Sequence, residues 1–365
     1  MKLAYFYRNL NQGGIQRMIV NAANYFADSG HEVTVVLMKR NGEYLPLLAP
    51  TVKVVYFKSL SKGRLFSSFV AILKEERFDV LFTATPSLNT FTIMARFVAG
   101  VKTKIVISER NNTVVFFKNS TLTLSKLTFL SIPLLYRFAD AIVAVSKGLG
   151  QSLKKVALIG EKKVHVIYNP AWTPELNEHS LKPVLHPWFD DPTVPVIITV
   201  GRLVKAKNHE LLIDAVAMVA KKRKVRLMII GDGPLRNELQ QKIDRLHMED
   251  YVRLEGFKLN PVSWISKASL FVLSSDYEGF GNVLVEALAA GVTIVSTDCN
   301  YGPSEILGAR YGYLVPVGDA KALAGKIEYA LNYPLERELL LHRARDFSVE
   351  NIMGHYQSLF TSLVS

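Results

Sequence analysis

The chain has 365 residues, of which 49% are hydrophobic and 21% are charged, a balance typical of a folded protein with a large core. Because a single core seldom grows beyond about 250 to 300 residues, we expect two domains. The single cysteine, Cys299, excludes an internal disulfide framework and a cysteine-rich metal site, and it favours a reducing compartment. The N-terminal residues lack the long apolar core of a signal peptide, so we expect a cytoplasmic protein.

The positive charge is confined to the first half of the chain. Residues 1–170 contain 23 Lys and Arg against nine Asp and Glu, a net charge of +14, whereas the remainder contains 21 against 23, a net charge of −2. A basic surface attracts nucleic acid, anionic lipid headgroups or phosphorylated substrates, and charge alone does not choose among them.

The longest apolar run of this half covers residues 127–136 and contains Pro133. It has about half of the roughly 20 residues that a bilayer span requires, so it is not a membrane span. With Lys118, Lys126 and Arg137 around it, the segment can form an amphipathic helix on a membrane surface or a helix packed on its own sheet.

Short apolar runs rich in valine and isoleucine predict strands that are buried on both faces. In the first half they are LAYFY, VTVVLM, VKVVYF, DVLFTA, KIVIS, AIVAV and VHVI. Amphipathic segments such as residues 64–76 lie between them, and this alternation predicts parallel strands covered by helices.

The pattern changes at residues 168–195, which contain six prolines and no sustained period, so we predict a linker at 173–193. The alternation restarts with VIITV, VRLMII, YVRLEG, LFVLS and TIVST. We therefore predict an α/β protein with two doubly wound, Rossmann-like domains in tandem.

In such sheets ligands bind at the carboxyl ends of the strands, so the strand-to-helix turns are the candidate sites. The first turn places Gly13 and Gly14 before a helix that begins near Ile15. Adjacent glycines suit an anion at a helix N-terminus, but a plain tight turn explains them equally well. The full G-x-G-x-x-G fingerprint of a nicotinamide site does not occur here.

The next turns carry cations and a further glycine pair. In GRLVKAKNHE, Arg202 and Lys207 flank a loop before a helix that starts near Asn208, and both can bind phosphate oxygens or remain ordinary solvated charges. In IIGDGPLRNEL, Gly231 and Gly233 form either a ligand loop or a capped turn before a helix starting near Pro234.

The fourth turn, SSDYEGFGNVLVEALAAG, carries two carboxylates. Glu278 lies in the loop, and Glu286 lies about one turn inside a helix that starts near Asn282 and ends at Gly291. Carboxylates accept paired hydrogen bonds from the vicinal hydroxyls of a ribose or hexose, and N–H groups at residues 280–282 suit a diphosphate. The alternative is that Glu286 faces water.

Together GRLVKAK and SSDYEGFGNVLVEALAAG resemble the donor-site signature of family 4 glycosyltransferases of the GT-B fold. GGIQRMIVNAA, ADAIVAVSKGL, VIYNP, IIGDGPLRNEL, LEGF and YGPSEIL resemble the same family in the same order, so the similarity covers essentially the whole chain. The segments SERNN and DCNYGPSEIL look most like the branch that extends bacterial surface polysaccharides or lipid-linked oligosaccharides.

The resemblance implies two Rossmann-like domains facing across a cleft. They are an acceptor-side domain at 1–172, joined by the linker at 173–193 to a donor domain at 194–345, with a C-terminal helix at 346–365 that packs back on the first domain. The helical spacing of apolar residues from Ile352 to Leu363 suits that packing.

The resemblance also implies a retaining transfer from a nucleotide sugar, most often a UDP-sugar, with no metal and no other cofactor. The lack of an Asp-x-Asp motif agrees with that. Matching positions give catalytic roles to Arg202 and Lys207, on the donor diphosphate, and to Glu278, on the transferred sugar. The substrate-binding positions are Gly13, Gly14, Arg110, Phe257, Phe280, Gly281, Asn282, Val283 and Glu286, with Glu286 on the ribose and Phe257 beside the base.

One position departs from the family. Many relatives have a histidine after the fifth strand, whereas this chain has Arg110 in ISERNN. Glu109, Arg110 and Asn111 can take over that role, contact an acceptor phosphate or form a structural Glu–Arg pair.

The expected partners are a nucleotide-sugar donor, a lipid-linked or glycan acceptor and the anionic inner leaflet, with the protein peripheral on the inner face of the cell membrane. Nucleic acid fits the charge but not the motifs. Two alternatives stay open: a GT-B relative that phosphorolyses or epimerises sugars without a lipid acceptor, and a catalytically inactive sugar-nucleotide-binding protein.

Overall fold

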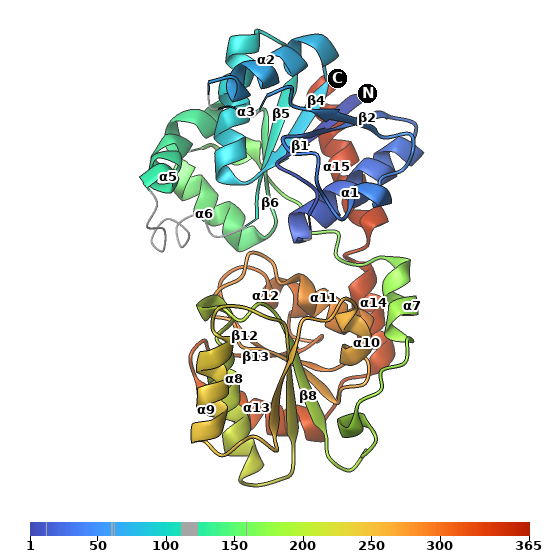
Figure 1. The fold of residues 1–365 in the computed structure, drawn as a ribbon, viewed down its shortest axis with the longest axis vertical. Coiled ribbons are helices and arrows are strands. Elements are labelled where there is room, and N and C mark those ends of the chain that lie inside the picture. Colours follow the sequence, from blue (N-terminus) through green and yellow to red (C-terminus); the bar gives the residue numbers. More distant parts are fainter. Residues whose placement is uncertain (12, 60, 62, 111–122, 158) are drawn as a thin grey trace. The chain divides into compact units, whose positions relative to one another are not determined.

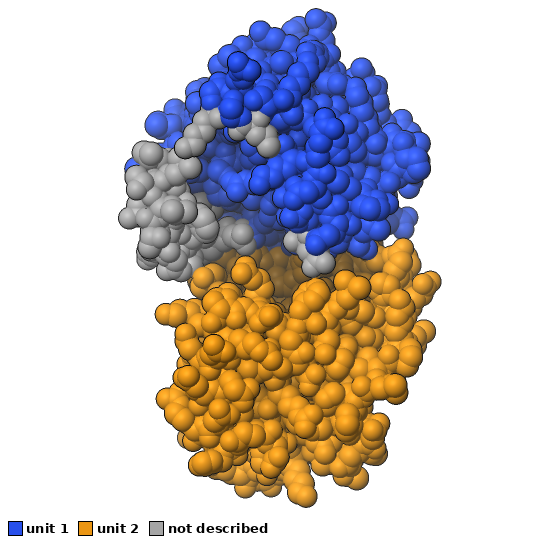
Figure 2. All heavy atoms as spheres, viewed as in Figure 1, with its two compact units in different colours: residues 1–170, 349–365 blue, residues 171–348 orange. Residues whose placement is uncertain are grey.

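The computed structural model describes residues 1–11, 13–59, 61, 63–110, 123–157 and 159–365, and the side chains of 123–127 and 161 are outside that description. The chain forms two compact units, residues 1–170 with 349–365 and residues 171–348 (Figure 2). Each unit is a parallel sheet covered by helices, which confirms the predicted fold class (Figure 1).

The sheet of the first unit has the strand order β3-β2-β1-β4-β5-β6-β7 among the described residues. Its strands are β1 (Lys2–Tyr7), β2 (Glu32–Leu37), β3 (Lys53–Tyr56), β4 (Val80–Ala84), β5 (Lys104–Glu109), β6 (Ala141–Ala144) and β7 (Val164–Val166). All five residues of β4 are buried, as the continuous apolar runs predict for strands with helices on both faces.

Helices cover both faces of this sheet. They are α1 (Gly14–Asp28), α2 (Leu65–Glu76), α3 (Pro86–Ala99), α5 (Thr123–Leu135), α6 (Lys147–Ala157) and α15 (Val349–Val364). Since side chains alternate along a strand, Phe6 stacks on Phe69 of α2, whereas Tyr5 faces the other way. On that second face Tyr356 of α15 contacts Phe82, so the C-terminal helix packs on the first unit, as predicted.

The sheet of the second unit has the order β10-β9-β8-β11-β12-β13. Its strands are β8 (Val196–Val200), β9 (Arg226–Ile230), β10 (Val252–Gly256), β11 (Leu270–Leu273), β12 (Ile294–Thr297) and β13 (Tyr313–Val315). Its helices are α7 (Pro174–Ser180), α8 (His209–Ala220), α9 (Arg236–Arg245), α10 (Pro261–Ile265), α11 (Asn282–Ala289), α12 (Pro303–Leu307), α13 (Ala320–Asn332) and α14 (Arg337–Arg345).

The segment expected to be a linker, 173–193, is packed into the second unit. It contains α7 and a 3₁₀ turn whose Trp188 is buried. Asn260 donates a hydrogen bond of 3.0 Å to the carbonyl of His179, and the ring of His186 contacts that of Trp264. The prolines make this segment irregular, but its aromatic side chains still anchor it.

In the described part of the chain, no helix is both long and apolar enough to cross a membrane. The apolar run at 127–136 forms most of α5, and the residues after it form a 3₁₀ turn. Of the cations predicted around it, Arg137 is exposed, whereas Lys118 and the side chain of Lys126 lie outside the described residues.

Candidate active site

Three of the four predicted turns lie at one edge of the second unit's sheet, because its paired strands are parallel. Strands β8 and β11 are neighbours, with Leu270 opposite Ile197. Their turns therefore lie side by side, although Arg202 and Glu278 are far apart in the sequence. This adjacency brings one of the predicted cations, Lys207, to one of the predicted carboxylates, Glu278.

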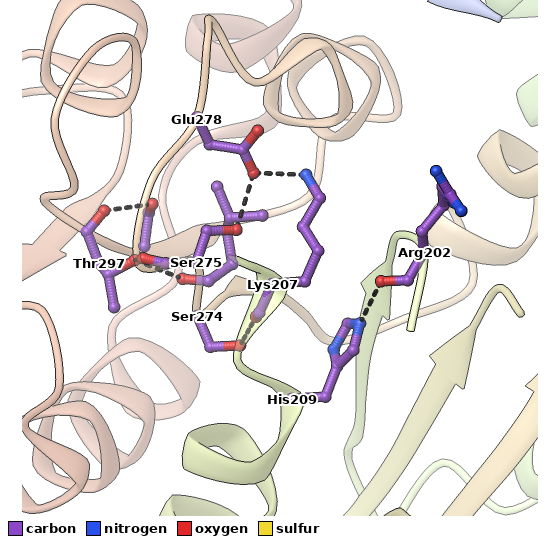
Figure 3. Close-up of polar contacts among 9 residues, drawn as sticks. Arg202, Lys207, His209, Ser274, Ser275, Glu278 and Thr297 are labelled. Carbon is purple, nitrogen blue, oxygen red and sulfur yellow. Dashed lines mark hydrogen bonds and ion pairs between the residues drawn. The ribbon is translucent and has the colours of Figure 1, made fainter. Parts of the chain in front are cut away.

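The ammonium of Lys207 and the carboxylate of Glu278 form an ion pair, with Nζ 2.5 Å from Oε1. The hydroxyl of Ser275 donates a second hydrogen bond, of 2.7 Å, to the same oxygen (Figure 3). The two paired side chains are only 23% and 10% exposed, so solvent screens this pair little. The sequence predicts separate ligand groups for Lys207 and Glu278, and it does not predict that the two side chains pair with each other.

The Lys207 turn is fastened to the Glu278 turn through its backbone. Ser274 Oγ donates to the carbonyl of Lys207 at 2.9 Å, and the backbone N–H of Asp276 donates to the carbonyl of Ala206 at 2.9 Å. The side chain of Asn208 donates to Asp276 Oδ1 at 2.7 Å and accepts the N–H of Leu211, which caps α8. These bonds fix the backbone of the Lys207 turn, and none of them involves the Lys207 ammonium.

Arg202 is exposed, and its guanidinium makes no hydrogen bond or ion pair among the described residues. Figure 3 shows its side chain on the same side of the two turns as the Lys207 ammonium. Its guanidinium is therefore open to bind an anion, and its role as a phosphate ligand stays a prediction.

His209 is a residue that the sequence did not single out. Its ring lies in the core, with Nε2 3.3 Å from the carbonyl oxygen of Arg202. Burial lowers the pKa of His209 to about 4, so the ring is neutral at pH 7, and we assign the proton to Nε2 as the donor to that carbonyl. His209 thus positions the backbone of Arg202.

Gly231 supports the Arg202 turn from the neighbouring strand. A Cβ built there would lie 2.0 Å from the carbonyl oxygen of Gly201, and its φ of +138° disfavours any L side chain. In the same turn the side chain of Asp232 accepts the N–H of Gly233 at 2.8 Å. Helix α9 starts at Arg236, two residues later than expected.

We expect Gly231→Ala to lower the free energy of unfolding by about 1–3 kcal/mol or more. Alanine strains the backbone at this φ, and its methyl group must also displace the Gly201 backbone. Chemical denaturation monitored by circular dichroism measures this. Gly325→Ala is the matched control: this exposed glycine inside α13 has no atom near a built Cβ, so alanine there should stabilise by about 0.5–1 kcal/mol. Equal stability of the two variants would contradict the role of Gly231.

Helix α11 starts at Asn282, as predicted, with Gly281 before it in the left-handed region at φ +97°. Phe280 is buried, and its ring contacts Phe347 at 5.6 Å between centroids. Asn282 and Val283 are half-buried in the first turn of the helix. This N-terminus provides a local positive potential at Asn282 and Val283.

Glu286 lies one turn further along α11 and is half-buried. No side-chain hydrogen bond or ion pair of Glu286 occurs within the described residues. Burial raises its pKa to about 7, although the nearby positive charge of Lys207 acts in the opposite direction. A carboxyl group whose pKa lies near 7, and whose oxygens have no hydrogen-bond partner in the described residues, is suited to a ligand that donates hydrogen bonds to it.

Phe257 follows β10 at the same edge of the sheet, and 63% of it is exposed. Its ring is available to a planar ligand group. Across the described residues, no three His, Cys, Asp or Glu side chains are grouped as metal ligands would be.

The remaining predicted residues lie in the first unit. Gly13 precedes α1 and Gly14 is its first residue. Arg110 is buried, and its guanidinium donates to Asn169 Oδ1 at 2.6 Å and to the Tyr356 hydroxyl at 3.3 Å. Burial lowers the pKa of Arg110. Of the residues grouped with it in the sequence, Asn111 lies outside the described residues.

Glu109, next to Arg110, is also buried but uses other partners. Its Oε1 accepts hydrogen bonds from Asn89 Nδ2 at 2.9 Å and from the hydroxyl of Tyr136. Burial and the adjacent Glu109 carboxylate raise the pKa of Tyr136. This network joins β5, α3 and the 3₁₀ turn after α5.

The model of the group 1 glycosyl transferases matches residues 187–347, and that of glycosyltransferase family 4 matches residues 12–171. A Campylobacter jejuni protein named N-acetylgalactosamine-N,N'-diacetylbacillosaminyl-diphospho-undecaprenol 4-alpha-N-acetylgalactosaminyltransferase is 31% identical over 334 residues, 88% of this chain and 88% of the relative. A C. jejuni GalNAc-alpha-(1->4)-GalNAc-alpha-(1->3)-diNAcBac-PP-undecaprenol alpha-1,4-N-acetyl-D-galactosaminyltransferase is 28% identical, covering 100% of this chain and 99% of the relative.

Among solved structures, Anabaena HepE in complex with UDP and glucose superposes with a TM-score of 0.79. The alignment covers 99% of this chain and 100% of HepE at 21% sequence identity. At this identity the likeness establishes a shared fold.

Proposed function

The chain belongs to the family 4 glycosyltransferases, and we propose that it transfers a sugar, with retention of anomeric configuration, from a UDP-sugar to a glycan carried on a polyprenyl diphosphate. One observation carries the proposal: a free guanidinium, an ammonium and two carboxylates occur at one edge of the GT-B donor unit. Two C. jejuni relatives are named for N-acetylgalactosamine transfer to undecaprenol-diphosphate glycans, and HepE was solved with UDP.

In this proposal Arg202 and Lys207 bind the donor diphosphate. As the bond from the sugar to the phosphate breaks, positive charge grows on the sugar ring and negative charge on the departing phosphate. Ser274 and His209 fix the backbone of the two turns through the carbonyls of Lys207 and Arg202, and the cations that these turns carry stabilise that negative charge. In this proposal no metal ion takes part.

The carboxylates take different parts of the donor. Glu278, held by Ser275, contacts the sugar that moves, with the backbone of Phe280 and Gly281, and Glu286 accepts hydrogen bonds from the ribose hydroxyls. The first turn of α11, at Asn282 and Val283, faces the diphosphate. We place the exposed Phe257 ring beside the base.

Acceptor binding is assigned to the first unit, whose sequence carries the positive charge. We propose that Gly13 and Gly14 approach the diphosphate. Arg110 is buried and its guanidinium is bonded to Asn169 and Tyr356, so we assign it a supporting position behind the acceptor site in place of direct contact with an acceptor phosphate. A cytoplasmic protein, peripheral on the inner face of the membrane, fits an anionic lipid-linked acceptor.

The pKa of Glu286 gives a pH dependence. The carboxyl group is mostly protonated at pH 6 and ionised at pH 8, because burial raises its pKa to about 7. The ionised form accepts one charge-assisted hydrogen bond from ribose on each oxygen, whereas the protonated form has only its carbonyl oxygen as a good acceptor, so the Kd for UDP should fall roughly tenfold between these pH values. Isothermal titration calorimetry measures it, with Glu286→Gln as the control that shares every other titrating group. Parallel pH profiles of Kd for the wild type and for Glu286→Gln would contradict the assignment of Glu286 to the ribose.

The proposed activity is tested by incubating the protein with a panel of nucleotide sugars and measuring nucleotide diphosphate release, with and without a membrane lipid extract. Release from a UDP-sugar that depends strictly on the extract supports the proposal. Conversion of the donor without the extract and without transfer would indicate an epimerase-like enzyme, and binding without turnover would indicate an inactive sugar-nucleotide-binding protein.

A further inference from the structure

A cluster of apolar side chains lies exposed on the first unit, and none of its members is among the residues assigned to the candidate active site. Its six members, which we call the α3–α5 patch, are between 46% and 63% exposed. They are Met94, Phe97, Val98, Leu130, Leu134 and Phe138. Isolated exposed apolar residues are normal on a protein surface, whereas a contiguous group indicates an interaction site.

Two observations make the group contiguous. Leu130, Leu134 and Phe138 are spaced four residues apart, so they lie on successive turns of α5 and the 3₁₀ turn that follows, while Tyr136 points into the core. The ring of Phe138 contacts that of Phe97 on α3 at 5.1 Å between centroids. Helices α3 and α5 pack side by side (Figure 1).

The two α3 residues beside Phe97 complete the patch. Met94 and Val98 are spaced one helical turn apart, and Val98 is next to Phe97 in the chain. Their exposure shows that α3 does not turn all of its apolar surface to the sheet. The sequence pattern of residues 127–136 alone did not indicate this contribution from α3.

Cations border the patch along the chain: Lys102 is four residues beyond Val98, Arg137 is next to Phe138, and Lys162 is next to Lys163. Lys102, Arg137, Lys162 and Lys163 have no carboxylate partner in the described part of the chain. Lys163 Nζ donates to the carbonyls of Arg137 and Ala139, at 2.6 and 3.1 Å, which places an ammonium directly beside Phe138.

The nearby carboxylate, Asp140, is already neutralised. It pairs with Arg96 and lies 3.8 Å from Lys104 Nζ. It also accepts the backbone N–H of Ile105 at 2.9 Å. An apolar face flanked by unpaired cations is complementary to a bilayer with anionic headgroups, because apolar side chains enter the acyl boundary while cations remain among the phosphates.

We propose that the α3–α5 patch is the surface by which this protein docks on an anionic lipid bilayer. The proposal depends on the proposed function only for the biological membrane concerned, since it rests on side chains outside the donor site. Docking by this face would place the first unit at the membrane surface, where the diphosphate of a lipid-linked acceptor lies.

The test is co-sedimentation of the full chain with vesicles, one set of phosphatidylcholine and one of phosphatidylcholine mixed with phosphatidylglycerol. We expect binding to the mixed vesicles that weakens with salt. Leu130→Gln/Leu134→Gln should lower that affinity at least roughly tenfold, because two apolar contacts are lost. Leu185→Gln/Leu246→Gln is the matched control, since both leucines are exposed on the second unit, and it should bind like the wild type.

A charge variant guards against a folding artefact. Arg137→Glu/Lys162→Glu should lose affinity for the mixed vesicles and keep its thermal unfolding temperature, because both side chains are exposed. Unchanged vesicle binding by either patch variant would overturn the proposal, as would a wild type that binds no vesicles. A leucine variant that changes only the oligomeric state on size exclusion would assign the patch to a protein contact instead.

The outcome is separable from that of the proposed function. Transfer to a detergent-dispersed lipid acceptor needs no bilayer, so the leucine variant should retain it. Loss of vesicle binding with retained transfer therefore supports the patch, and vesicle binding without any transfer would leave the patch intact while contradicting the proposed function.

Discussion

Arg202→Ala is expected to lower kcat by roughly 10²-fold or more, by analogy with the loss of one preorganised donor to a developing oxyanion. The guanidinium is exposed and has no protein partner in the described residues, so the whole of its interaction is available to the donor diphosphate. The interaction strengthens as negative charge grows on the leaving phosphate, so kcat should change more than KM.

The stability of Arg202→Ala should be close to that of the wild type, because an exposed side chain without contacts is removed. Steady-state kinetics with a UDP-sugar and lipid extract measure the effect. Lys205→Ala is the control, since Lys205 is an exposed cation in the same turn, and its kcat should be essentially unchanged. Full turnover by Arg202→Ala would contradict the proposal that Arg202 stabilises the departing diphosphate.

Lys207→Met is expected to have two effects. Turnover should fall by roughly 10²-fold or more for the same electrostatic reason. In addition the largely buried Glu278 carboxylate loses its ammonium, which should lower the free energy of unfolding by about 1 kcal/mol or more. Methionine keeps the apolar stem of Lys207, which packs over Gly201.

The double variant Lys207→Met/Glu278→Gln separates the two effects. The neutral amide removes the uncompensated charge while Ser275 can still donate to it, so stability should recover but turnover should not. Denaturant unfolding and steady-state kinetics on the same preparations provide the comparison. Recovery of turnover in the double variant would show that Lys207 acts only by neutralising Glu278.

Much of the fold follows from local sequence. Runs of valine and isoleucine identified the long strands because a parallel sheet buries both faces of each strand. Strand β13 was not predicted, because its three residues lie between Gly312 and Pro316 and form too short an apolar run to stand out. The sequence of 173–193 predicts a linker because its prolines indicate an irregular backbone, but prolines do not indicate whether an aromatic side chain such as Trp188 is packed.

The candidate site was predicted residue by residue but not as an arrangement. The ion pair between Lys207 and Glu278 depends on β8 and β11 being neighbours, and strand order is not readable from spacing. His209 is close to Arg202 in the chain, yet it acts on a backbone carbonyl, which leaves no mark in the pattern of residue types. The exposed patch on α3 was missed because exposure is a property of packing.

The most direct test of the central claim is transfer from a radiolabelled UDP-sugar to a membrane lipid extract in the presence of EDTA, followed by extraction of the lipid phase. We expect label in the lipid phase with the wild-type protein and a rate at least roughly 10²-fold lower with Arg202→Ala. Label that stays in the aqueous phase with every donor tried, or equal transfer by the two proteins, would contradict the account.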